Sequence, residues 1–264
     1  MKKKILAISL VVAMLAVAVI GGTLAYFTDT TAEQQNTFKV GGVDIDLTEP
    51  AWDATAAHTL VPGTTFAKDP TITVAAGSQD AWVFLKLDMN KYVSLINLMG
   101  VDAYKNGVAG LSGNYPGFTA FMTTLLESNS TRETVINRWF SGINHADWKI
   151  MNLEEIKTAV SGAASQTNPV LGTMILGYQK STLKAGESVR FMTGFGIPAT
   201  VTQSMFDGAD AYYINDVNGV SKSASNFNTE KAGFKMTFIA CAVQAEGLNT
   251  LELAYAQVPA EFRA

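Results

Sequence analysis

The run Ala81-Trp82-Val83-Phe84-Leu85-Lys86-Leu87 carries the strongest fold signal in this chain. It is apolar on both faces over its first five residues, as is typical of a strand that is covered on both sides within a sheet. The preceding run, Thr71-Ile72-Thr73-Val74, alternates polar and apolar residues, and Ala76-Gly77-Ser78 separates the two. We therefore expect two strands here, and the second of them is expected to be central.

Strand signals recur on both sides of this segment, at residues 43–47, 171–179, 187–195 and 235–243. The pattern changes between them, where apolar residues recur at spacings of three and four in a helical stripe: Phe118, Phe121, Met122, Leu125 and Leu126. Ser130 or Thr131 is the expected cap of a following helix, and Asn152 the expected cap of another. The order predicts a mainly β fold: an antiparallel jelly-roll-like β-sandwich with a helical insertion at about 91–165. Helical turns are expected at 251–256.

The first 25 residues read as a secretory signal peptide. Lys2, Lys3 and Lys4 precede an apolar run from residue 5 to residue 20, and the small residues Thr23 and Ala25 place the cut before Tyr26. The alternative is an uncleaved membrane anchor. The apolar run spans only about 24 Å as a helix against a bilayer core of about 30 Å, although counting on to residue 24 would just reach. Cleavage is the favoured interpretation, and membrane attachment would involve only an uncleaved signal.

Removing the signal leaves 239 residues, which we expect to form a single domain, 26–264. Its 16 basic and 23 acidic residues give a formal charge of −7. This balance argues against a nucleic-acid partner and against electrostatic docking on anionic lipid. Cys241 is the single cysteine, so no intramolecular disulfide forms. Its apolar neighbours favour a buried, inert thiol over a thiol-linked dimer.

The sequence contains few residue patterns that are typical of catalytic sites. The two histidines, His58 and His145, belong to no H-E-x-x-H pair, so they are only weak candidates for a metal site. Motifs for a nucleophile or for a phosphate-binding loop are missing. The sequence predicts no catalytic residues and no cofactor. Five aromatic residues are expected to pack in the core, although a ligand groove is the alternative: Trp82, Phe84, Trp139, Phe140 and Trp148.

The junction Gly21-Gly22-Thr23-Leu24-Ala25-Tyr26-Phe27-Thr28-Asp29 closely resembles the TasA/camelysin family, whose members are processed by a SipW-type signal peptidase. Other segments match the family in the expected order, at residues 36–45, 60–70, 81–87, 183–188 and 242–248. The segment 60–70 resembles a proline–glycine loop followed by Lys-Asp. The resemblance runs along the whole chain, but residues 91–165 match poorly.

The resemblance implies a jelly-roll-like sandwich, secreted to the cell surface or the extracellular matrix. Family members assemble into biofilm-matrix fibres in which the N-terminal segment of one subunit adds as a strand to the next. The corresponding donor tract here is 26–40, and its assembly residues are Tyr26, Phe27, Thr28, Thr37 and Phe38. An open sheet edge accepts such a strand, and a head-to-tail contact that does not close gives a filament. The implied partners are further copies of the chain, the signal peptidase during export, and other matrix proteins.

Two alternative functions remain. Camelysin is described as a surface metallo-endopeptidase, and that activity needs a metal motif, which this sequence does not display. A monomeric surface protein that binds a ligand or a host partner through residues 91–165 is the other alternative. The free, strand-compatible N-terminal tract favours the fibre subunit.

Overall fold

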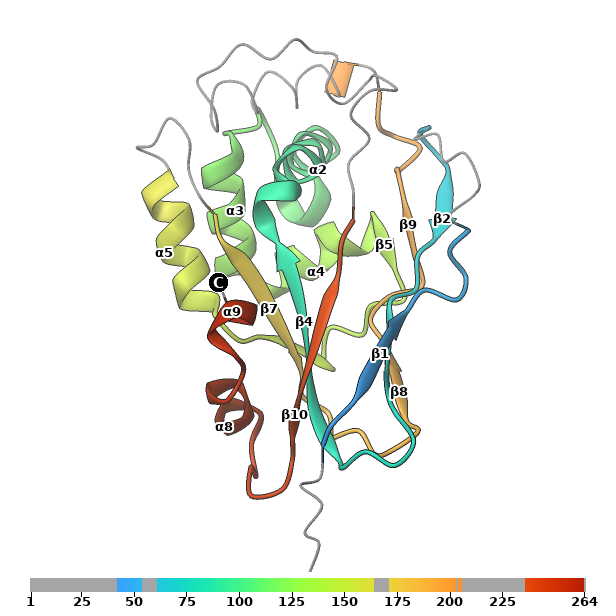
Figure 1. The fold of residues 1–264 in the computed structure, drawn as a ribbon. Helices are drawn as coiled ribbons and strands as arrows, with labels where there is room; N and C mark the ends of the chain where they lie inside the picture. Colours follow the sequence, from blue (N-terminus) through green and yellow to red (C-terminus); the bar gives the residue numbers. More distant parts are fainter. Residues whose placement is uncertain (1–41, 54–60, 164–170, 203, 206–235, 264) are drawn as a thin grey trace, which may run out of the picture. The chain divides into compact units, whose positions relative to one another are not determined.

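Strand β4 (Ala81–Asp88) lies inside a four-stranded antiparallel sheet, which confirms the prediction from its two-sided apolar pattern (Figure 1). On one side it pairs with β10 (Ile239–Gln244) and on the other with β7 (Thr173–Tyr178). Strand β6 (Trp148–Ile150) follows β7, so the order of this central sheet is β10-β4-β7-β6. The computed structural model describes residues 42–53, 61–163, 171–202, 204–205 and 236–263.

Two further antiparallel sheets have three strands each. The small sheet has the order β1-β3-β8, with β1 at Ile45–Thr48, β3 at Thr71–Val74 and β8 at Ser188–Arg190. The third sheet has the order β2-β9-β5, with β2 at Thr65–Ala67, β9 at Gly194–Gly196 and β5 at Phe140–Ser141. The predicted antiparallel character is confirmed. A jelly-roll sandwich is not shown, because the described strands form three separate sheets and none of these closes.

The segment 91–165 contains helices as predicted, but it also contributes strands. Its helices, after the short turn η1 (Met89–Lys91), are α2 (Val93–Lys105), η2 (Val108–Gly110), α3 (Phe118–Glu127), α4 (Asn129–Asn137) and α5 (Leu153–Ala163). The expected stripe on α3 is buried along its whole length. Strands β5 and β6 place Phe140 opposite Phe195 and Trp148 opposite Tyr178, so aromatic pairing joins this segment to two sheets.

Two expected helix caps differ from the structure. Helix α4 is capped by Ser128, an extended residue whose Oγ accepts from the Thr131 amide at 3.3 Å, so the prediction of Ser130 or Thr131 was wrong. Asn152 does precede α5, but its side chain bonds to strand β7. It donates to the Thr173 carbonyl at 2.7 Å and accepts from the Ile175 amide at 3.0 Å. This side chain therefore fixes the start of α5 to the central sheet.

The predicted strand 187–195 is two strands in different sheets. The chain follows β3 as β8, then the Phe191 amide bonds to the Pro70 carbonyl and the Thr193 amide to the Ser141 carbonyl. From Gly194 onward the chain pairs with β2 and β5 as β9. Strand β8 therefore ends, and β9 begins, where the chain changes its hydrogen-bonding partners.

The central sheet has an apolar cluster on each face. On one face, Val83 and Leu85 pack with Ile72 and Val74 of the small sheet, so the two sheets share a core. The opposite face packs Phe84 and other apolar residues against the C-terminal helices α8 (Leu251–Ala256) and α9 (Ala260–Arg263). The expected helix at 251–256 is confirmed. Within the described ranges, every helix is too short or too polar to cross a bilayer.

Candidate functional site

Most of the predicted site residues lie outside the described residues. These are the cleavage site Ala25–Tyr26, the assembly residues Tyr26, Phe27, Thr28, Thr37 and Phe38, and the metal candidate His58. The sites that the structure does describe are the histidine His145, the sheet edge that would accept a strand, and the loop carrying Lys68 and Asp69.

His145 lies in the loop between β5 and β6, where its Nε2 is 2.9 Å from the Asn137 Oδ1 atom. Burial lowers the pKa of His145 below its usual 6.5, opposed by the Glu133 carboxylate and assisted by the Arg132 guanidinium. In the described part of the chain, no three His, Cys, Asp or Glu side chains are grouped to hold a metal ion.

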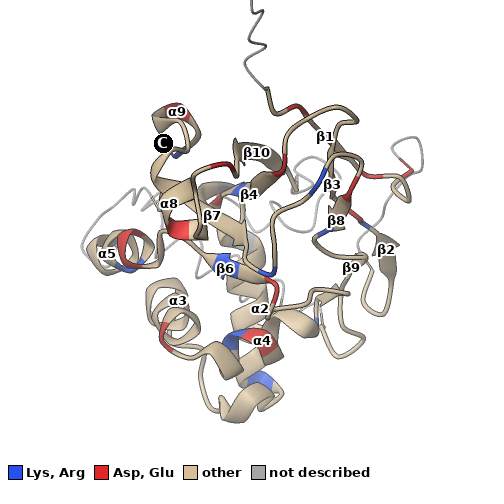
Figure 2. Cartoon of the chain, turned by 90° about the horizontal axis from the view of Figure 1, so that it is seen from below, with Lys and Arg blue, Asp and Glu red and all other residues tan. Residues whose placement is uncertain are grey.

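Strand β10 forms an edge of the central sheet. Its partner is β4, in the register Ile239 opposite Lys86 through Gln244 opposite Ala81, and no other described strand pairs with it. Its sequence IACAVQ has neither charge nor proline, and Figure 2 shows the strand without charged residues. Edge strands are commonly protected from further pairing by lysine, proline or a bulge. None of these protections is present within β10, and Ile239 keeps 49% of its surface exposed.

Strand β1, the edge of the small sheet, lies beside β10 without pairing with it. In Figure 1 the two strands converge at their lower ends and separate above. Ile45 and Leu47 of β1 pack on the same apolar cluster as Ala240 and Ala242 of β10. Two edges without a further partner among the described strands therefore border one core.

Cys241 lies in the middle of β10, at the edge of the central sheet. Its side chain is half-buried and packs with the cluster under α8, on the opposite face from Ala240 and Ala242. Burial raises the pKa of the Cys241 thiol, and the Glu261 carboxylate raises it further. The sequence favours a buried thiol, whereas the structure shows a half-buried thiol that ionises less readily than an ordinary one.

Lys68 and Asp69, in the loop at residues 60–70, contact the residues that follow β1. Both are buried, at 7% and 5% exposure. The Lys68 Nζ is 2.6 Å from the Glu49 Oε2 atom and 4.6 Å from the centre of the Trp52 ring. The Asp69 Oδ1 accepts from the Ala51 amide at 2.9 Å. Both side chains thus fasten the residues after β1, which is a structural role.

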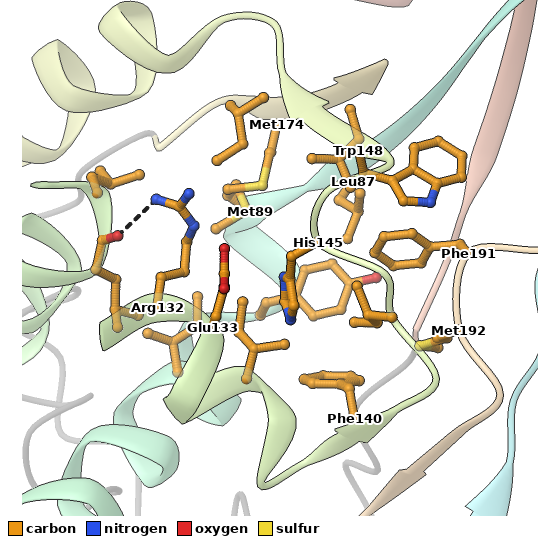
Figure 3. A pocket seen from close by; sticks show the side chains of 18 of the residues that line it. Leu87, Met89, Arg132, Glu133, Phe140, His145, Trp148, Met174, Phe191 and Met192 are labelled. Atoms are coloured by element: carbon orange, nitrogen blue, oxygen red, sulfur yellow. Dashed lines mark hydrogen bonds between the residues drawn. The ribbon is translucent and has the colours of Figure 1, made fainter. Parts of the chain in front are cut away.

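A cavity of about 520 Å³ lies next to His145 (Figure 3). Its walls come from strands β4, β6 and β7 and from helices α2, α3 and α4. Residues outside these elements also line it, among them Phe191, Met192, Met236 and Phe238. Of the five aromatic residues considered for a groove, Phe140 and Trp148 line it. Sequence reasoning missed this cavity, because its walls come from residues between 87 and 238 that only the fold brings together.

The comparisons with known proteins give one match. Residues 1–93 match the family model described as camelysin metallo-endopeptidase. No curated protein and no solved structure matches the chain. The described residues within the match include β1, β2, β3 and β4 and the Lys68–Asp69 loop, whereas β10 and the walls from α3 and α4 lie beyond it.

Proposed function

We propose, since residues 1–93 match the camelysin family model and the chain resembles the TasA/camelysin family, that the processed chain is a secreted structural subunit of extracellular fibres. In this proposal the tract 26–40 of one subunit adds as a strand to a sheet edge of the next. Repetition of this head-to-tail contact gives a filament in the matrix or on the cell surface. The shared core of the small and central sheets supports a sandwich-like subunit.

The observation that carries the proposal is the unpaired edge of β10. It is the longest of the described edge strands, at six residues, and it lacks the charges and prolines that discourage pairing. An added strand would take up the outward N–H and C=O groups of β10, while alternate side chains would contact the two faces beside it. The free edge of β1 next to it adds apolar surface from the same cluster.

The expected binding free energy is large enough for a stable contact between subunits when the aromatic residues of the tract 26–40 are buried. A six-residue edge offers about six outward hydrogen bonds at roughly 1 kcal/mol net each. Tyr26, Phe27 and Phe38 add about 1.5–3 kcal/mol for each ring that is buried. Association costs at least about 4 kcal/mol, so backbone pairing alone is marginal and the rings make the contact stable.

A surface metallo-endopeptidase is the second candidate, favoured by the description of the matched family. The described residues do not fit it, because no group of three potential metal ligands occurs among them. A casein-cleavage assay with and without a chelator tests it. Chelator-sensitive cleavage by the purified protein would reverse the order of the two candidates.

Electron microscopy of the processed protein tests the fibre proposal. One preparation starts at Tyr26 and a matched one starts at Thr37, which removes Tyr26, Phe27 and Thr28 but leaves the described residues intact. We expect filaments from the first and monomers from the second. Identical filaments from both, or monomers from both under assembly conditions, would refute donor-strand assembly.

A further inference from the structure

The cavity beside His145 has the size and the wall of a small-molecule site. Its volume of about 520 Å³ lies within the range of about 300–1,000 Å³ that such sites occupy. The proposed fibre contact does not use it.

The wall favours a flexible apolar ligand. Six of the ten methionines of the chain line the cavity: Met89, Met99, Met122, Met174, Met192 and Met236. Unbranched methionine side chains adapt their shape to apolar partners better than branched ones do. Leucine, isoleucine and aromatic residues form most of the remaining surface. A linear hydrocarbon chain suits such a wall better than a rigid polar ligand.

Three polar side chains of the wall lie together, since Figure 3 shows Arg132, Glu133 and His145 near one another. Arg132 donates to two neutral oxygens, the Leu125 carbonyl at 3.0 Å and the Asn129 Oδ1 at 2.8 Å. Among the described residues, no carboxylate forms an ion pair with its guanidinium. Burial lowers the pKa of Arg132, because a half-buried cation lacks full compensation.

The Arg132 side of the wall suits an anionic head group. The Lys149 Nζ is paired with the Glu252 Oε1, at 2.6 Å, so Arg132 and Glu133 are the charges of the wall that remain for a ligand. A guanidinium with unused N–H donors binds a carboxylate through two parallel hydrogen bonds. Glu133 repels an anion, so the head group must lie on the Arg132 side.

We propose that this cavity binds a single-chain fatty acid, with the hydrocarbon among the methionines and the carboxylate on Arg132. Calorimetric titration of the processed protein, stripped of lipid, tests this with three probes that share one chain: dodecanoate, dodecanol and dodecylamine, each below its micelle concentration. We expect dodecanoate to bind with the highest affinity and dodecylamine with the lowest.

Two neighbouring substitutions on α4 separate the head-group contact from general damage. Arg132→Gln should weaken dodecanoate binding by about tenfold or more and leave dodecanol binding unchanged, because it removes one charge-assisted contact. Glu133→Gln should keep or strengthen dodecanoate binding. Thermal unfolding checks that both variants are folded.

Three outcomes would overturn the proposal. Tighter binding of dodecylamine that is lost in Glu133→Gln would assign the cavity to a cation. Equal binding of all three probes would remove the role of Arg132. Binding of none of them would mean that the cavity is filled in the free protein. If Arg132→Gln does not fold, the ranking of the three probes on the unaltered protein decides the question.

Discussion

Asp102 is a fully buried carboxylate on α2 that joins this helix to the end of α4 and to the chain after β9. It accepts from the Arg138 Nε and Nη2 atoms at 3.0 Å each, from the Asn106 Nδ2 at 2.8 Å and from the Thr200 Oγ1 at 3.2 Å. Removing one partner of a buried ion pair leaves the other without compensation. Asp102→Ala should therefore lower the free energy of unfolding by about 3 kcal/mol in urea titrations.

The exposed ion pair between Lys157 and Glu154 is the matched control for Asp102. Its atoms are as close, at 2.8 Å, but the Glu154 side chain is 82% exposed. Glu154→Ala should therefore cost no more than about 0.5 kcal/mol. Similar losses for Asp102→Ala and Glu154→Ala would show that Asp102 does not hold these elements together.

His145 makes the stability of the fold depend on pH. Because burial lowers its pKa below 6.5 in the folded state, the unfolded chain binds the proton more readily. The folded state therefore keeps its full stability above pH 6.5 and loses part of it as the pH falls through 6.5. Between about pH 7.5 and about pH 5, the unaltered protein should lose more unfolding free energy than His145→Gln in parallel denaturant titrations. Parallel curves for the two proteins would contradict a shifted His145.

Among the elements, β10 is the one for which the fibre proposal makes the most specific prediction about assembly. A lysine on an edge strand discourages the addition of another strand, because its charge must be desolvated. Ile239→Lys should shift filament formation to higher protein concentration or abolish it, as measured by sedimentation and microscopy. Leu253→Lys on α8 is the control, since Leu253 is equally exposed at 51% but belongs to a helix and not to the edge strand. Equal assembly by the two variants would move the contact to another edge.

Elements with a strong local pattern could be predicted, whereas their partners could not. The runs at 71–74 and 81–87 became β3 and β4, and the helix at 251–256 was found in full. Local alternation cannot show that 187–195 changes partner at Phe191, because hydrogen bonding to Pro70 and Ser141 is a long-range property. For the same reason, the sequence alone does not predict that β10 lacks a second partner among the described strands. His145 was recognised from its residue type, but the cavity beside it depends on how helices and sheet pack.

At the scale of the whole molecule, the proposed donor tract lies inside the family match and the proposed accepting edge lies outside it. Residues 1–93 include the proposed donor tract and strands β1 to β4, while β10, which pairs with β4, is the proposed accepting edge. In this proposal one subunit carries both halves of a head-to-tail contact. The central claim is that tract 26–40 of one subunit lies against β10 of another.

Disulfide trapping tests this claim most directly, because Cys241 is the single cysteine of the chain and lies in the middle of β10. Cysteines are placed one at a time between Thr28 and Phe38, and each protein is treated with a mild oxidant after assembly. We predict a ladder of covalent oligomers at the position that lies opposite Cys241, and none at its two neighbours, because neighbouring strand residues face opposite sides. The unaltered protein, which can form only Cys241–Cys241 dimers, is the control. Cross-links confined to monomers, or no oligomer beyond the control at any position, would contradict the account.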